Sequence, residues 1–85
     1  MSKKQQVQKN IDLSVKLTDY VIENPSVAKS TPVDSSYVLF SLRDKELNKM
    51  NEKIVKKLIK EGKTVIKAEE TTSKQDPWIF TTITP

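Results

Sequence analysis

The segment from residue 37 to residue 69 most constrains the fold, because strand and helix signals alternate within it over a short distance. The run YVLF at 37–40 is continuous, apolar and rich in β-prone residues, as expected of a strand buried on both faces. An amphipathic stretch follows and ends at Gly62, which suits the left-handed position after a helix. The half-polar run TVIKAE at 64–69 is predicted as a second strand. Because the crossover is so short, the two strands should be parallel with a right-handed connection.

A further helix is predicted before this unit and a third strand after it. The helix should begin near Asn10 or Asp12, both good N-cap residues. It should end at Asn24, because the residue before a proline is disfavoured in a helix, and Pro25 can open one more short turn. The third strand is WIFTTIT at 78–84. The inward side of the first helix is predicted to carry Leu13, Leu17, Tyr20 and Val21.

These elements predict a single small α+β domain over residues 10–85, preceded by a flexible basic tail at 1–9. The order is α-β-α-β-β, with two helices and a three-stranded mixed sheet arranged as two layers. Because YVLF is the most apolar strand, we place it at the centre, in the order 2-1-3. The hairpin order 1-2-3 is the competing arrangement.

The composition excludes several classes of function. The chain has no cysteine and no histidine, so disulfides, thiolate nucleophiles and the usual general base and metal ligand are absent. Its single glycine rules out a glycine-rich phosphate loop. No stretch reaches the roughly 18 consecutive apolar residues of a membrane span, and no apolar region follows the basic N-terminus. We therefore expect a cytoplasmic, non-catalytic protein without metal, cofactor or membrane contact.

The helix within the central unit, predicted from Leu42 or Lys45 to Glu61, carries two asparagines on its apolar side. The residues just before it, at 41–44, have the spacing of a capping box. At 100° per residue, Asn51 falls in the middle of the inward face and Asn48 at its edge. The apolar residues that define this face are Leu47, Met50, Ile54, Val55 and Leu58.

The chain resembles a family of short prokaryotic domains without an assigned activity. The resemblance rests on a helix ending in Asn24-Pro25, the YVLF strand, the pattern Asp44-x-x-Leu47-x-x-x-Asn51, and Gly62-Lys63 before a Val-rich strand. It extends from Asn10 to about Glu70. The resemblance implies the fold and singles out Asn51, and it implies no mechanism.

Asn51 has three interpretations. A structural amide would bond loop backbone near 32–36, since buried polar groups are usually paired within the fold. Alternatively, the amide reads a small polar ligand, an anion above all, at the carboxyl end of the first strand and the helix N-terminus. A third possibility is recognition of a partner chain. The ligand crevice would be lined by Ser41, Arg43, Asn48 and Asn51.

The net charge of +4 comes from the second helix and its flanks: residues 43–67 hold nine basic and four acidic residues. A lysine stripe lies opposite the apolar face and is typical of a solvated helix surface. The alternative is a non-specific phosphate-binding face, although the stripe lacks arginines and aromatic residues that read or stack on bases. The stripe consists of Lys45, Lys49, Lys53, Lys56 and Lys60.

On the last strand, Trp78 and Phe80 point to one side and Ile79 and Ile83 to the other. Trp78 either seals the edge of the core or belongs to an interface, because two helices stacked on one sheet face would leave an apolar patch on the other. We expect a small interaction or regulatory module that forms a homodimer or binds a protein partner. The alternatives are nucleic-acid binding through the lysine stripe and sensing of a polar ligand at Asn51.

Overall fold

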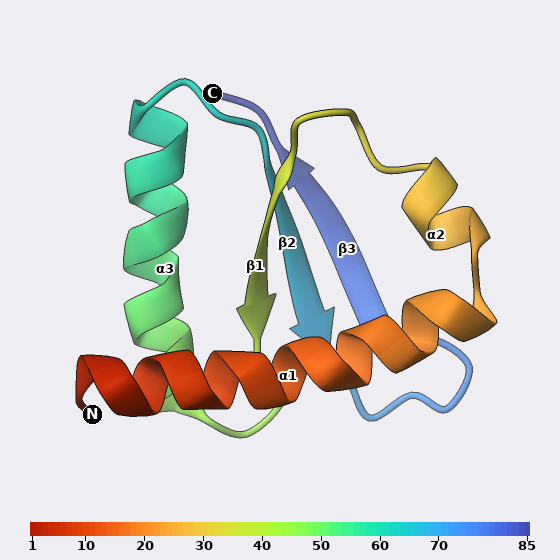
Figure 1. The fold of residues 1–85 in the computed structure, drawn as a ribbon, viewed down its shortest axis with the longest axis horizontal. Helices are drawn as coiled ribbons and strands as arrows, with labels where there is room; N and C mark the ends of the chain where they lie inside the picture. Colours follow the sequence, from red (N-terminus) through yellow and green to blue (C-terminus); the bar gives the residue numbers. More distant parts are fainter.

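The strand-helix-strand unit predicted at the centre of the chain is present in the computed structural model, which describes residues 1–85. Its two strands pair in parallel, with Ser36 opposite Val65. Figure 1 shows these strands beside a helix that runs along them. The elements in chain order are α1 (Lys3–Glu23), α2 (Ser26–Lys29), β1 (Ser36–Phe40), α3 (Lys45–Lys60), β2 (Val65–Glu70) and β3 (Trp78–Ile83).

The strand order in the sheet is β1-β2-β3, so the predicted order 2-1-3 is wrong and the competing order 1-2-3 is correct. β3 runs antiparallel to β2. The connection between them is short and is closed by a hydrogen bond of 2.8 Å from the Thr71 N–H to the Pro77 carbonyl oxygen. β3 therefore folds back directly beside β2, as antiparallel neighbours joined by a short loop commonly do.

β1 is apolar because a helix covers each of its two faces, and not because it is the central strand of the sheet. Leu39 and Ala68 face one way and pack with Leu17 of α1. Val38 faces the other way and packs with Val55 of α3. The two long helices thus cover opposite faces of the sheet, whereas the two-layer prediction implied a single helical layer. The α+β class and the mixed sheet with a parallel first pair are confirmed.

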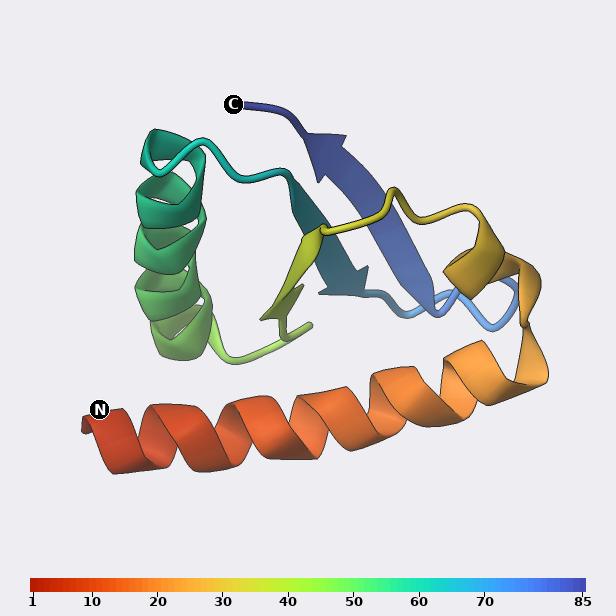
Figure 2. The same cartoon turned by 45° about the horizontal axis from the view of Figure 1, so that its top comes forward.

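Helix α1 begins seven residues earlier than Asn10, the earlier of its two predicted starts, and includes most of the segment predicted as a tail. Ser2 is its N-cap and forms a capping box, in which the Ser2 hydroxyl accepts from the Gln5 N–H and the Gln5 side chain accepts from the Ser2 N–H. Figure 2 shows α1 passing from beneath α3 to α2. The additional turns place residues 3–9 beside the amino-terminal end of α3.

Helix α3 has defined ends. Asp44 is its N-cap and accepts a hydrogen bond of 3.0 Å from the Leu47 N–H, so the cap is Asp44 and not the Ser41 of the predicted capping box. Gly62 adopts φ of +81°, the left-handed conformation expected after the helix. Lys9 of α1 donates to Asp44 at 2.7 Å.

No helix has the length and apolar character needed to cross a membrane.

The cap at Asp44 predicts a pH dependence of stability. Hydrogen bonds from Lys9 and from the Leu47 N–H lower the pKa of the Asp44 carboxyl in the folded protein. A lowered folded pKa contributes stability above the carboxyl's ordinary pKa, and this contribution is lost as the pH falls through the lowered value. We expect Asp44→Asn, which keeps a good cap without the charge, to be less stable than wild type at neutral pH. The difference should shrink below pH of about 4 in acid titrations followed by circular dichroism. A difference that stays constant with pH would contradict this role of the charge.

Candidate functional site

Asn51 is buried, with 1% of its surface exposed, where α3 meets the outer edge of β1. The Ser36 N–H points toward Thr64, on the side of β2. Because successive residues of a strand direct their backbone groups to opposite sides, Tyr37 and Leu39 direct theirs to the free edge. The Asn51 amide donates to the Leu39 carbonyl oxygen at 2.8 Å. The side chain therefore occupies a backbone acceptor that the edge strand would otherwise leave unpaired.

The rest of the Asn51 amide is bound by α1. Its nitrogen donates to the Asn10 side-chain oxygen at 2.8 Å, and its oxygen accepts from the Asn10 amide nitrogen at 3.1 Å. The same oxygen accepts from the Gln6 amide nitrogen at 3.1 Å. No buried side-chain nitrogen or oxygen lacks a partner. The structure thus supports the structural interpretation of Asn51, with Leu39 and α1 as partners in place of the predicted loop at 32–36.

Of the four residues predicted to line a ligand crevice, three have side chains that are hydrogen-bonded within the chain. The Asn48 side chain clamps the backbone of Ser41, accepting from its N–H at 2.7 Å and donating to its carbonyl at 2.8 Å. The Ser41 hydroxyl in turn accepts from the N–H groups of Arg43 and Asp44. Arg43 is exposed. Both asparagine side chains are therefore engaged in hydrogen bonds within the fold.

Gln6 and Asn10 are residues of this cluster that the sequence interpretation missed. The sequence pattern predicts Gln6 in a tail and Asn10 at the start of the helix, and the structure instead places both side chains against Asn51. A signal was present in the sequence: Val7, Ile11 and Val15 recur every four residues, which extends the helical pattern toward the N-terminus.

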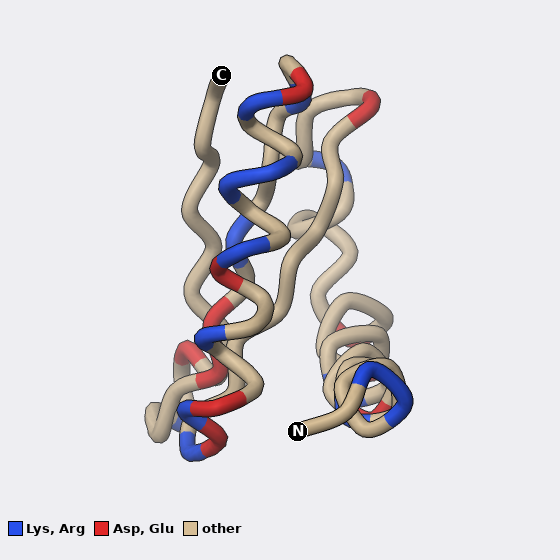
Figure 3. Tube along the Cα trace, turned by 90° about the vertical axis from the view of Figure 1, so that its left-hand side faces the viewer, with Lys and Arg blue, Asp and Glu red and all other residues tan.

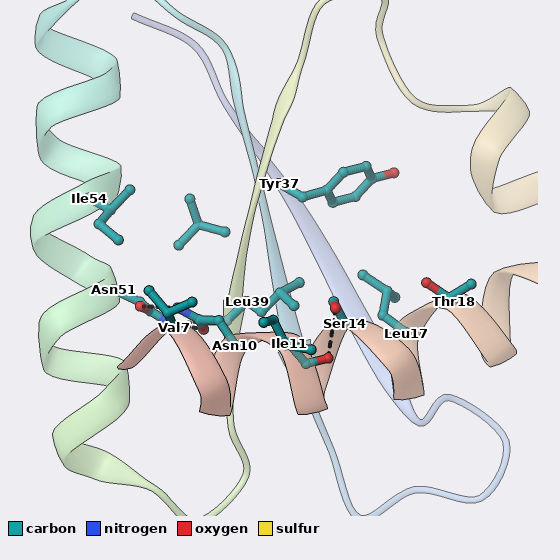
Figure 4. Close-up of a pocket in the computed structure, with 11 residues that line it drawn as sticks. Val7, Asn10, Ile11, Ser14, Leu17, Thr18, Tyr37, Leu39, Asn51 and Ile54 are labelled. Atoms are coloured by element: carbon teal, nitrogen blue, oxygen red, sulfur yellow. Dashed lines mark hydrogen bonds between the residues drawn. The ribbon is translucent and has the colours of Figure 1, made fainter. Parts of the chain in front are cut away.

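An open cavity of about 530 Å³ lies next to this cluster, between α1, β1 and α3. Seven of its eleven lining residues are hydrophobic. Figure 4 shows Ile54 approaching from α3, Tyr37 from β1, and the α1 residues along one side. Its polar side-chain groups are the hydroxyls of Ser14, Thr18 and Tyr37 and the amides of Asn10 and Asn51. We call this cavity the α1–α3 groove.

The α1–α3 groove is bordered by large apolar side chains that remain accessible. Val7 and Ile11 of α1 are 58% and 50% exposed, and Tyr37 and Ile54 are 41% and 37% exposed. Scattered exposed apolar residues are normal, whereas a contiguous set around a concave surface tends to mark an interaction site. The groove is therefore a candidate for binding an apolar surface or ligand.

The predicted lysine stripe is exposed along α3, and Figure 3 shows its basic residues along the helix. None of the five lysines forms an ion pair with an acidic residue of the chain. Glu52, which interrupts the stripe, lies 3.7 Å from the Lys67 ammonium. The stripe is thus an uncompensated basic surface without arginine or aromatic residues.

The two aromatic residues predicted for an interface are mostly inside the protein. Trp78 is 6% exposed and belongs to the core under α1. Phe80 is partly buried, and its ring stacks on Tyr20 with centroids 6.3 Å apart. The accessible apolar residue of β3 is instead Ile79, which is 52% exposed. Trp78 therefore fits the interpretation in which it seals the core.

No group of three or more acidic residues is positioned to hold a metal ion. Asp44 is the group whose pKa is clearly displaced, and its shift is explained by the cap and by Lys9.

The comparison with known families bears on residues 5–82, which match the model of the Family of unknown function (DUF5647). The chain belongs to this family. The resemblance to a family of short domains without an assigned activity is thereby confirmed. No curated protein and no solved structure matches the chain.

Replacing Asn51 by leucine tests the structural amide. Leucine would complete the apolar side of α3, but it would leave the Leu39 carbonyl and the amides of Gln6 and Asn10 without their partner. We expect a loss of about 1–3 kcal/mol in the free energy of unfolding, measured by denaturant titration.

Two comparisons sharpen this prediction. Lys53→Leu, on the exposed side of the same helix, should change stability by less than about 0.5 kcal/mol. The double variant Asn10→Leu with Asn51→Leu should lose less than the sum of the two single losses, because the residues share hydrogen bonds. An Asn51→Leu protein that unfolds at higher denaturant than wild type would disprove the structural role.

Proposed function

We propose that this chain is a small non-catalytic interaction module that associates with protein through the α1–α3 groove and the apolar residues around it, and that it self-associates. The observation that carries the proposal is the set of accessible apolar residues Val7, Ile11, Tyr37 and Ile54 around one concave surface. A water-filled apolar groove is unfavourable, and covering it removes that surface from water.

The size of the protein adds to this argument. Only 12 of 85 residues are buried, so the core is thin. Small domains bury a low fraction of their surface on folding, and a further interface stabilises them through mass action. The contiguous apolar residues around the α1–α3 groove are therefore better explained by a partner than by the fold.

The test is the concentration dependence of the molecular mass, measured by light scattering after gel filtration. We expect the wild type to approach the mass of a dimer at micromolar concentration. Ile11→Glu places a charge among the apolar residues that line the groove and should weaken association at least about tenfold, as loss of an apolar anchor does.

Ile79→Glu is the matched control, because Ile79 is similarly exposed but lies on β3, outside the groove. It should leave association unchanged. A wild type that stays monomeric at all concentrations would contradict the self-associating function. An association that Ile79→Glu abolishes and Ile11→Glu does not affect would place the interface elsewhere.

The unpaired lysines of α3 favour a second candidate, an accessory protein that binds nucleic acid through phosphate contacts. Such binding is independent of sequence and weakens steeply with salt. If the stripe is instead only a solvated surface, it should bind generic duplex DNA or RNA no more tightly than roughly 10 µM at physiological salt, and this is the result we expect.

The matching variant replaces Lys49, Lys53 and Lys56 by glutamine and should change stability by no more than about 0.5 kcal/mol per residue. Fluorescence anisotropy with labelled duplexes measures the binding. A tight complex that the triple variant loses would favour the nucleic-acid candidate over the interaction module.

A further inference from the structure

Helix α1 carries a second apolar side that the fold does not bury. Leu13 and Leu17 face the core, whereas Val7, Ile11, Val15 and Ile22 lie at spacings of four, four and seven on the neighbouring side. These four residues are between 50% and 71% exposed. We call them the α1 stripe. Val7 and Ile11 also border the groove, so the stripe continues its apolar surface along the helix.

The charges of α1 are placed against its own dipole. Lys3 and Lys4 occupy the first turn, where the helix end is positive, and the first turn holds no acidic residue. Glu23 ends the helix and Asp19 lies one turn earlier, and the last turn holds no basic residue. All four residues are exposed, and none forms an ion pair within the chain. Within one molecule this distribution is unfavourable.

Both features have one explanation in a second copy of the chain. We propose that the α1 stripes of two copies pack against each other in antiparallel orientation, with a two-fold axis between Ile11 and Val15. Lys3 and Lys4 of one copy then lie at the level of Glu23 and Asp19 of the other, at both ends of the contact. This inference rests on the proposed function, because it identifies the partner and the surface of the self-association.

The self-complementarity of α1 favours a second copy over other partners. In a two-fold interface the same surface of both copies takes part, so that surface must be complementary to itself. An apolar stripe with lysines at one end and carboxylates at the other meets this requirement when the two helices are antiparallel. A parallel pair would place lysine against lysine and acid against acid. An anionic membrane would attract the lysines but repel Asp19 and Glu23, so a lipid surface fits the charge pattern less well.

The first experiment compares Val15→Glu with Val33→Glu by light scattering and sedimentation equilibrium. Val15 belongs to the stripe and not to the groove, and Val33 is a more exposed valine in the loop before β1. Val15→Glu should weaken dimerisation at least about tenfold, and Val33→Glu should leave it unchanged. Both proteins should keep the wild-type circular dichroism spectrum, because both side chains are accessible.

The second experiment reverses charges. Lys3→Glu with Lys4→Glu should weaken the dimer at least about tenfold, because acidic ends then face each other, and Asp19→Lys with Glu23→Lys should do the same. The variant carrying all four substitutions should dimerise again, because the antiparallel pair regains opposite charges at each end. The four substitutions place acidic residues in the first turn of α1 and lysines near its last turn, which is the favourable arrangement for the helix dipole, so the four-fold variant is expected to fold.

Several results would overturn the antiparallel pair. A dimer that is indifferent to Val15→Glu and to the charge reversals, yet is lost in Ile11→Glu, would refute the α1 pairing while leaving the groove as the interaction surface. A four-fold variant that stays monomeric would refute the antiparallel orientation. A wild type that is monomeric at every concentration and binds vesicles containing phosphatidylserine would refute the second copy as partner.

Discussion

The side chain of Asn51 holds together the three elements on which the arrangement of the molecule depends. It takes the outward carbonyl of Leu39 in β1, exchanges hydrogen bonds with Asn10, and accepts from Gln6, while its own backbone belongs to α3. A buried amide is costly unless all of its groups are paired. The pairing is possible only if α1 crosses the edge of β1 at the height of Asn51. The amide therefore specifies where α1 lies, which apolar packing alone would define less sharply.

The edge of β1 shows how this constraint shapes the surface. An unpaired strand edge is a site for unwanted pairing, and proteins commonly cover such edges. Here the Asn51 amide and α1 occupy the carboxyl end of the edge, while Tyr37 borders the open groove farther along it. Because one face of α1 closes the edge and packs on the sheet, the neighbouring face turns away from the core. The exposed α1 stripe is thus a consequence of the position that Asn51 imposes on the helix.

The β1-α3-β2 unit could be predicted from sequence because its signals are local. YVLF is strand-like, Gly62 ends the helix, and the short crossover leaves little choice of handedness. The position of β1 in the sheet could not be predicted in the same way, since burial by two helices and burial between two strands give the same apolar run. The partners of Asn51 could not be predicted either, because Gln6 and Asn10 are more than forty positions away in the chain. Periodicity indicates which way an amide points, but not what it meets.

The first turns of α1, before Asn10, are also not predictable from local composition. Its first turns carry Lys3 and Lys4 where a helix favours acidic residues, so the segment has the composition of a solvated tail. Within the fold, the Ser2 capping box and the hydrogen bond from Gln6 to Asn51 offset that charge distribution. At the carboxyl-terminal end Asn24 caps the helix by donating to the Tyr20 carbonyl, but Asp19 and Glu23 have no ion-pair partner in the chain. The core is thin, the charges of α1 oppose its dipole, and one side of α1 exposes aliphatic residues. Covering α1 would therefore stabilise the protein more than covering any other part of its surface. An interface on this helix would supply both the apolar burial and the opposite charges that the isolated chain lacks.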